Sequence, residues 1–102
     1  MPLVKVCNVS DVPNNEMRIF EVNGGKVVVY NVSGTFYCTG NVCAHKQGSI
    51  GEGYLDSDAK SVTCPLHGWM YDITTGKSLG MPVSIGSFPV KVENNQVLAN
   101  MP

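Results

Sequence analysis

Residues 64–72 read Cys-Pro-Leu-His-Gly-Trp-Met-Tyr-Asp, and the triplet Cys43-Ala44-His45 comes before them in the chain. Eighteen residues, 46–63, separate the two segments. The chain of 102 residues has only two histidines and four cysteines, and both histidines lie two or three positions after a cysteine. Cysteine and histidine at such short spacing are typical of metal ligands, so the sequence predicts one metal site built from two short loops.

Short predicted strands surround these loops. Eleven glycines and six prolines interrupt the chain every few residues, and Asn23-Gly24-Gly25 and Ser33-Gly34 are turn signals. No stretch long enough for a helix has a sustained 3.6-residue apolar period, so we expect little or no helix. Strands are predicted at Leu3–Val9, Met17–Val22, Lys26–Val32, Thr35–Thr39, Tyr54–Leu55, Ser61–Cys64, Trp69–Ile73, Lys77–Leu79, Phe88–Val92 and Gln96–Ala99.

Many short strands with glycine-rich turns indicate an all-β fold, a sandwich or barrel of antiparallel sheets. At this length we expect a single domain, residues 1–102. Residues 1–40 and 82–102 would form the base sheets. Residues 41–81, where regular alternation stops, would be a loop-rich insertion that carries the metal site.

Composition excludes several classes of protein. The chain is 43% hydrophobic and 15% charged, with a net charge of −1, so it is neither disordered nor basic enough to bind nucleic acid. The longest apolar run, Val27–Tyr30, is far shorter than the ~20 residues of a membrane span. Residues 1–7 lack the pattern of a signal peptide. We therefore expect a cytoplasmic protein with reduced thiols.

Two thiolates and two imidazoles can hold two kinds of centre. In a mixed-ligand [2Fe–2S] centre, the thiolates bind one iron and the imidazoles bind the other. A mononuclear zinc ion with the same four ligands is the alternative. Zinc sites usually place paired cysteines before paired histidines, whereas Cys43, His45, Cys64 and His67 are interleaved. This order favours the iron–sulfur centre.

The pattern Cys-x-His, eighteen residues, then Cys-x-x-His-Gly resembles the Rieske iron–sulfur motif, and the chain as a whole resembles the small soluble Rieske-type ferredoxins. The resemblance implies the Rieske fold and one [2Fe–2S] cluster. It implies that Cys43 and Cys64 ligate the buried iron, and that His45 and His67 ligate the outer iron. Such an oxidised site is uncharged, so it accepts an electron more easily than a site with four thiolates.

The resemblance extends to other residues near the ligands. Gly48 and Gly68 would let backbone N–H groups approach the sulfides, because no Cβ intervenes. The segment Gly80-Met81-Pro82 falls where the family places a proline-containing loop against the cluster. Trp69 is expected to pack in the core or to shield the cluster.

Departures from the high-potential members of the family bear on the reduction potential. Those members resemble this chain but carry an extra cysteine in each loop, joined as a disulfide, and a serine where this chain has Trp69. Their tyrosine is matched by Tyr71. Because each hydrogen-bond donor aimed at the cluster favours the reduced state, we expect a potential near the bottom of the Rieske range of about −150 to +300 mV.

The resemblance implies a one-electron carrier that passes electrons from a ferredoxin reductase to a terminal oxygenase. No residues remain for substrate chemistry, so we expect no catalytic residues and no enzyme activity in isolation. We expect a monomer that binds neither nucleic acid nor membrane. The alternative is a small iron–sulfur subunit of an enzyme complex such as assimilatory nitrite reductase.

Cys7 and Cys38 lie in predicted strands without a neighbouring histidine. The simplest interpretation is that both pack as small buried hydrophobic residues. A disulfide or a regulatory thiol stays open as the alternative.

Overall fold

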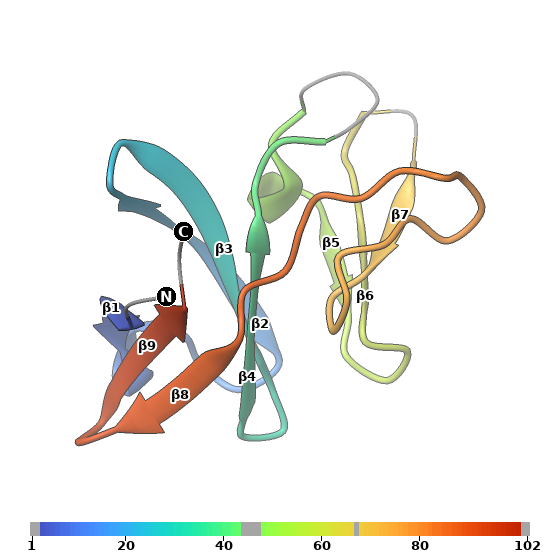
Figure 1. Cartoon of the computed structure of the whole chain (residues 1–102). Helices are drawn as coiled ribbons and strands as arrows, with labels where there is room; N and C mark the ends of the chain where they lie inside the picture. Colours follow the sequence, from blue (N-terminus) through green and yellow to red (C-terminus); the bar gives the residue numbers. More distant parts are fainter. Residues whose placement is uncertain (1–2, 44–47, 67, 101–102) are drawn as a thin grey trace.

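In the computed structural model, which describes residues 3–43, 48–66 and 68–100, the strands form three antiparallel sheets of three strands each (Figure 1). The sheets have the orders β1-β9-β8, β2-β3-β4 and β5-β6-β7. Within the described ranges the only helices are two 3₁₀ turns, which confirms the all-β expectation. The elements are β1 (Leu3–Asn8), η1 (Val9–Asp11), β2 (Glu16–Val22), β3 (Gly25–Val32), β4 (Thr35–Gly40), η2 (Ile50–Glu52), β5 (Tyr54–Asp56), β6 (Ser61–Thr63), β7 (Met70–Asp72), β8 (Val90–Glu93) and β9 (Gln96–Asn100).

Strand β3 is the centre of the molecule because it is buried on both faces. Val27 and Val29 face the sheet β1-β9-β8, whereas Val28, Tyr30 and Val32 face the sheet β5-β6-β7. Successive side chains of a strand point to opposite faces, so an unbroken apolar run suits a strand that is covered on both sides. The run of valines thus joins two hydrophobic cores through one strand.

Two tight turns set the register of the middle sheet. Asn23 and Gly24 have φ values of 51° and 83°, and Ser33 and Gly34 have 51° and 90°. Positive φ at both central residues of a turn matches the right-handed twist of antiparallel strands. The meander predicted from these turns is confirmed, because β2, β3 and β4 pair in sequence order.

The third sheet covers one face of the middle sheet. Its strands place Leu55, Val62 and Tyr71 opposite one another on one face. Val62 and Tyr71 are fully buried against β3, and Leu55 packs partly buried beside them. Burial of such side chains stabilises the fold by roughly 1.5–3 kcal/mol each. Figure 1 shows this sheet on the opposite side of β2-β3-β4 from the sheet β1-β9-β8.

Apart from shifts of one residue at the ends of other strands, the structure differs from the predicted strands in two places. Residues 77–79 form only the isolated bridges Tyr71↔Ser78 and Lys77↔Ser84, because glycines with positive φ at positions 76 and 80 interrupt the extended backbone on both sides. Strand β8 begins at Val90 rather than Phe88. The Phe88 N–H donates instead to the Cys38 carbonyl oxygen of β4, at 2.9 Å, and so ties two sheets together.

Candidate metal centre

Cys43 and Cys64 each open a short loop that closes in the same way. The Cys43 N–H donates to the Gly48 carbonyl oxygen at 2.9 Å, and the Cys64 N–H donates to the Trp69 carbonyl oxygen at 2.7 Å. In both loops the acceptor lies five residues after the cysteine. The two loops therefore present their cysteines in equivalent local surroundings, as a site with matched ligands requires.

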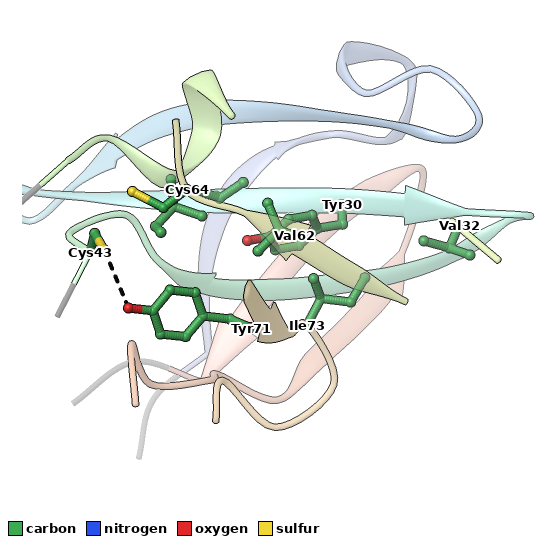
Figure 2. Close-up of a cluster of buried hydrophobic side chains, with 9 residues drawn as sticks. Tyr30, Val32, Cys43, Val62, Cys64, Tyr71 and Ile73 are labelled. Carbon is green, nitrogen blue, oxygen red and sulfur yellow. Dashed lines mark hydrogen bonds between the residues drawn. The ribbon is translucent and has the colours of Figure 1, made fainter. Parts of the chain in front are cut away.

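The two cysteine thiols share one end of a buried cluster of side chains (Figure 2). Each cysteine is 1% exposed, and both are free thiols. The Cys43 Sγ lies 3.3 Å from the Tyr71 hydroxyl, which comes from β7. The Leu66 N–H donates to the Cys64 Sγ at 3.4 Å. Each sulfur thus already has one donor of the kind that stabilises a metal-bound thiolate.

Burial raises the pKa of the Cys64 thiol above its ordinary value. The Leu66 N–H lowers this pKa, and the neighbouring Cys43 thiol raises it. Both thiols belong to the same buried cluster of side chains. Two adjacent thiolates in a buried site repel each other. A metal cation that binds both sulfurs compensates for this repulsion.

Gly48 brings the two loops into contact. A Cβ at this position would lie 3.0 Å from the Cys64 Sγ and 3.1 Å from the Leu66 Cδ1. Any larger residue would push the second loop away from the first. Gly68 is required for a different reason, since its φ of 70° lies in the region that favours glycine.

The segment Gly80-Met81-Pro82 lies beside the second loop. The bridge Tyr71↔Ser78 continues with a hydrogen bond from the Leu79 N–H to the Met70 carbonyl oxygen at 2.9 Å. This antiparallel register carries the tip of the 80–82 turn alongside residues 68–70. Trp69 packs partly buried against the same core as the two cysteines, in keeping with the expected packing role.

Both candidate histidine ligands, His45 and His67, lie outside the described residues. In the sequence, each histidine falls between a cysteine and the residue whose carbonyl oxygen accepts from the N–H of that cysteine. Among the described residues no three histidine, cysteine or acidic side chains come together. The structure therefore brings together Cys43 and Cys64 of the four sequence candidates.

The chemistry of the described residues fits an iron–sulfur cluster. Soft thiolates suit iron–sulfur centres, and the two sulfurs converge from two loops rather than from one. Hydrogen-bond donors stand at both sulfurs, and core side chains surround them. Backbone and side-chain donors to the sulfurs are the usual means by which a protein tunes such a cluster.

Cys7 and Cys38 lie in the other hydrophobic core, on β1 and β4. Both are buried free thiols. Burial is the main cause that raises the pKa of Cys7 to about 11 and that of Cys38 to about 12. A thiol with such a pKa is protonated at neutral pH and is a poor metal ligand. Of the alternatives that the sequence left open for Cys7 and Cys38, the structure shows packing as buried residues.

Asn41 is a buried residue of the site region that sequence reasoning did not single out. Its side-chain oxygen accepts a hydrogen bond from the Gly51 N–H at 2.8 Å, and its side-chain nitrogen donates to the Ser49 hydroxyl at 3.1 Å. The signal in the sequence is an asparagine shortly before the loop, with a serine and a glycine shortly after the loop. Such a pattern could have indicated side-chain hydrogen bonds across the ends of the loop.

The sequence of the chain matches one protein family over most of its length. Residues 2–89 match the model of the Rieske [2Fe–2S] domain. The chain belongs to this family, whose clusters carry two cysteine and two histidine ligands. The expected Rieske fold and cofactor are thus confirmed.

Characterised relatives are electron-carrier components of oxygenase systems. The ferredoxin component of the naphthalene 1,2-dioxygenase/salicylate 5-hydroxylase systems of Ralstonia sp. is 36% identical over 89% of this chain and 88% of the relative. The ferredoxin component of the biphenyl 2,3-dioxygenase of Rhodococcus jostii is 36% identical over 99% and 94%. These relatives are ferredoxins rather than catalysts.

Solved structures support the same fold. The ferredoxin of carbazole 1,9a-dioxygenase from Nocardioides aromaticivorans has a TM-score of 0.92 over 100% of both chains, at 22% identity, which shows the fold alone. A complex of oxygenase and ferredoxin in carbazole 1,9a-dioxygenase contains a chain with a TM-score of 0.83, 34% identical over 96% of this chain and 92% of that one. No described helix is long and apolar enough to cross a membrane.

Proposed function

We propose that this chain is a one-electron carrier that receives electrons from a ferredoxin reductase and passes them to a terminal oxygenase. The observation that carries the proposal is the convergence of two identically closed loops on the buried, adjacent thiols of Cys43 and Cys64. The relatives that share this chain's full length are ferredoxin components of dioxygenase systems. When bound, the [2Fe–2S] cluster supplies a site that takes up and releases one electron.

In this proposal Cys43 and Cys64 ligate the inner iron, and His45 and His67 ligate the outer iron. The proposal rests on the sequence motif for the histidines and on burial and proximity for the cysteines. Tyr71 and the Leu66 N–H hold the cysteine sulfurs by hydrogen bonds. The protein's own contribution is to exclude water from the sulfurs and to keep both loops in place.

The proposed division of the chain follows the same logic. Residues 41–81 form the cluster-binding insertion, and residues 1–40 and 82–102 form the base. The support is that the whole sheet β5-β6-β7 lies between positions 54 and 72, whereas the sheet β1-β9-β8 pairs the first described strand with the last.

The proposed partner face is the end of the molecule that carries the two cysteine loops. Val42 and Leu66 are 59% and 45% exposed, and each lies within two residues of a buried cysteine. Exposed apolar side chains that gather near a functional group are typical of partner contacts. A net charge of −1 provides little long-range steering, so short-range apolar contact with an oxygenase is the proposed mode of recognition.

We further propose that the carrier is a monomer and works in the cytoplasm. Its four cysteines are free and buried, which suits a reducing compartment. The alternative role, a small subunit of a nitrite reductase, has weaker support. A structure assigned to such a subunit has a TM-score of 0.83 but is only 18% identical, which shows the fold alone.

The experiment is to express the chain, measure iron and acid-labile sulfide, and record visible and EPR spectra before and after reduction. Two irons and two sulfides per chain are expected, and Cys43→Ser, Cys64→Ser, His45→Ala and His67→Ala should each lose the reduced Rieske EPR signal. Cys7→Ser is the matched control and should keep the signal. A colourless protein with one zinc would overturn the proposal.

Electron transfer is tested with the reduced chain and an oxidised terminal oxygenase. Stopped-flow absorbance would follow reoxidation of the chain by the oxygenase components of naphthalene and carbazole dioxygenase systems. Reoxidation by at least one of them supports the carrier role. Isolation of the chain only in a fixed stoichiometric complex with a nitrite reductase would support the alternative.

A further inference from the structure

Asn41 is one of four buried polar residues in the described part of the chain, and it precedes Cys43 by two positions. Its side chain is 5% exposed. Buried amides are retained where their hydrogen bonds are satisfied. Among the described residues, the hydrogen bonds of the Asn41 side chain reach the segment that follows the first ligand loop.

Hydrogen bonds join Asn41 to each of residues 49, 50 and 51. Its backbone oxygen accepts from the Ile50 N–H at 2.8 Å, and its Oδ1 accepts from the Gly51 N–H at 2.8 Å. Its Nδ2 donates to the Ser49 Oγ at 3.1 Å. The side chain thus connects the start of the first ligand loop, before Cys43, to the segment after its end.

The two ligand loops differ in how their ends are held. The second loop leaves and re-enters a regular ladder, in which Thr63 pairs with Met70 and Val62 with Tyr71. The first loop has only the isolated bridge between Val42 and Ser49. A single bridge constrains a loop less than a ladder of successive pairs. The side chain of Asn41 supplies the additional hydrogen bonds at the place where the ladder is missing.

Residues 49–51, which accept and donate these hydrogen bonds, are held against the hydrophobic core. Ile50 is fully buried in the same cluster as Cys43 and Cys64. A Cβ on Gly51 would overlap the side chain of Ile19 in β2, so η2 lies tightly against the middle sheet. Figure 1 shows η2 as a short coil beside the end of β4.

We propose that Asn41 is a positioning residue for the [2Fe–2S] centre, because its amide holds the two ends of the first ligand loop together and so keeps Cys43 opposite Cys64. This inference rests on the proposed ligand assignment. The amide is hydrogen-bonded to Ser49 and Gly51, so its effect on the cluster is exerted through the loop.

The first test follows the holoprotein. Asn41→Ala should speed the loss of the visible cluster spectrum to an iron chelator by about tenfold, because it removes the side-chain hydrogen bonds to Ser49 and Gly51. It should also broaden the reduced EPR signal. Asn41→Asp keeps the oxygen that accepts from the Gly51 N–H, and its second oxygen can accept from the Ser49 hydroxyl, so cluster loss should stay within about twofold of wild type.

Asn31→Ala is the matched control. Asn31 is also a buried asparagine, and it bridges two backbone segments through the Val12 carbonyl oxygen at 2.9 Å and the Gly34 N–H at 3.0 Å. Its removal should lower the free energy of unfolding comparably but leave cluster loss and the EPR line shape unchanged. Equal effects of the two alanine variants on the cluster would overturn the positioning role.

The second test uses the apoprotein and does not depend on the cluster. Phenylarsine oxide binds pairs of adjacent thiols, and the binding that Cys43→Ser abolishes reports the Cys43–Cys64 pair. Asn41→Ala should weaken this binding by about tenfold, and Asn31→Ala should not. If the wild type assembled no cluster but the arsenical still distinguished the two variants, the carrier function would fail, whereas the role of Asn41 in keeping Cys43 opposite Cys64 would stand. Unchanged arsenical affinity in Asn41→Ala would refute the positioning role.

Discussion

The hydroxyl of Tyr71 lies 3.3 Å from the Sγ of Cys43, although 28 positions separate the two residues in the chain. Tyr71 is fully buried on β7, and Cys43 opens the first ligand loop. Once Cys43 is a metal-bound thiolate, the hydroxyl is the donor and the sulfur is the acceptor. Strand β7, which follows the second loop, thereby contributes a hydrogen bond to the ligand of the first loop.

Tyr71→Phe should lower the reduction potential. The hydrogen bond stabilises the more negative, reduced state more strongly, so its loss favours the oxidised state. A net hydrogen-bond contribution of about 0.5–1.5 kcal/mol corresponds to a decrease of about 20–60 mV for one electron. Protein-film voltammetry measures the shift.

Tyr30→Phe is the control for this potential. Tyr30 is an equally buried tyrosine whose hydroxyl is hydrogen-bonded to the Thr39 Oγ1 at 2.7 Å rather than to a cysteine sulfur. It should lose stability without a change in potential. Equal shifts in the two variants would show that the hydrogen bond to Cys43 is not the cause.

The buried thiols of the second core predict a loss of stability at alkaline pH. Burial raises the pKa of Cys38 from 9.0 to about 12 and that of Cys7 to about 11. Between these values and 9.0 the unfolded chain releases protons that the folded chain retains, so stability is full below pH 9 and falls as pH rises towards 12. The slope is at most about 1.4 kcal/mol per pH unit for each thiol.

Urea unfolding between pH 8 and pH 11 measures this slope. Cys38→Ala should lower stability at pH 8 but show a shallower decline above pH 9, because one of the two buried thiols no longer titrates. Parallel curves for the variant and the wild type would contradict the assignment of the alkaline loss to Cys38.

Substitution by alanine should lower the free energy of unfolding more at Gly76 than at Gly24. Both have positive φ, 78° and 83°, so alanine is strained at either position, by about 1 kcal/mol. At Gly76 a Cβ would also lie 2.5 Å from the backbone oxygen of Gly86, whereas at Gly24 nothing lies within 4 Å. Gly76→Ala should therefore cost roughly 1–3 kcal/mol more than Gly24→Ala in urea unfolding. Similar costs would mean that the backbone around Gly86 can move aside.

The exposed residues beside the cysteines predict a local partner face. Val42→Glu and Leu66→Glu should each slow electron transfer to an oxygenase by about fivefold or more, because they place a charge in an apolar contact. Val92 is the matched control. It is similarly exposed, at 48%, but it lies on β8 in the sheet β1-β9-β8 rather than beside a cysteine. Val92→Glu should leave the rate unchanged. An equal decrease in all three variants would argue against this face.

Much of the fold could be predicted from local signals. The turns at Asn23-Gly24 and Ser33-Gly34 correctly delimit β2, β3 and β4, because positive φ is a property of the residues themselves. The strand at 77–79 could not be excluded in this way. Its alternation resembles a strand, but regular pairing depends on what the neighbouring chain provides, and here only single bridges form.

For the candidate site, too, local patterns in the sequence determine some features and tertiary packing determines others. The sequence by itself determined the types of ligand and their spacing, because Cys-x-His and Cys-x-x-His-Gly are local patterns of chemistry. Only the tertiary structure decided that the Tyr71 hydroxyl lies within hydrogen-bond distance of the Cys43 sulfur, that Gly48 packs against the Cys64 sulfur, and that Asn41 closes the first loop. The reason is physical: a local pattern specifies what a short segment can do, whereas these contacts join segments that meet only when the loops and sheets pack against one another.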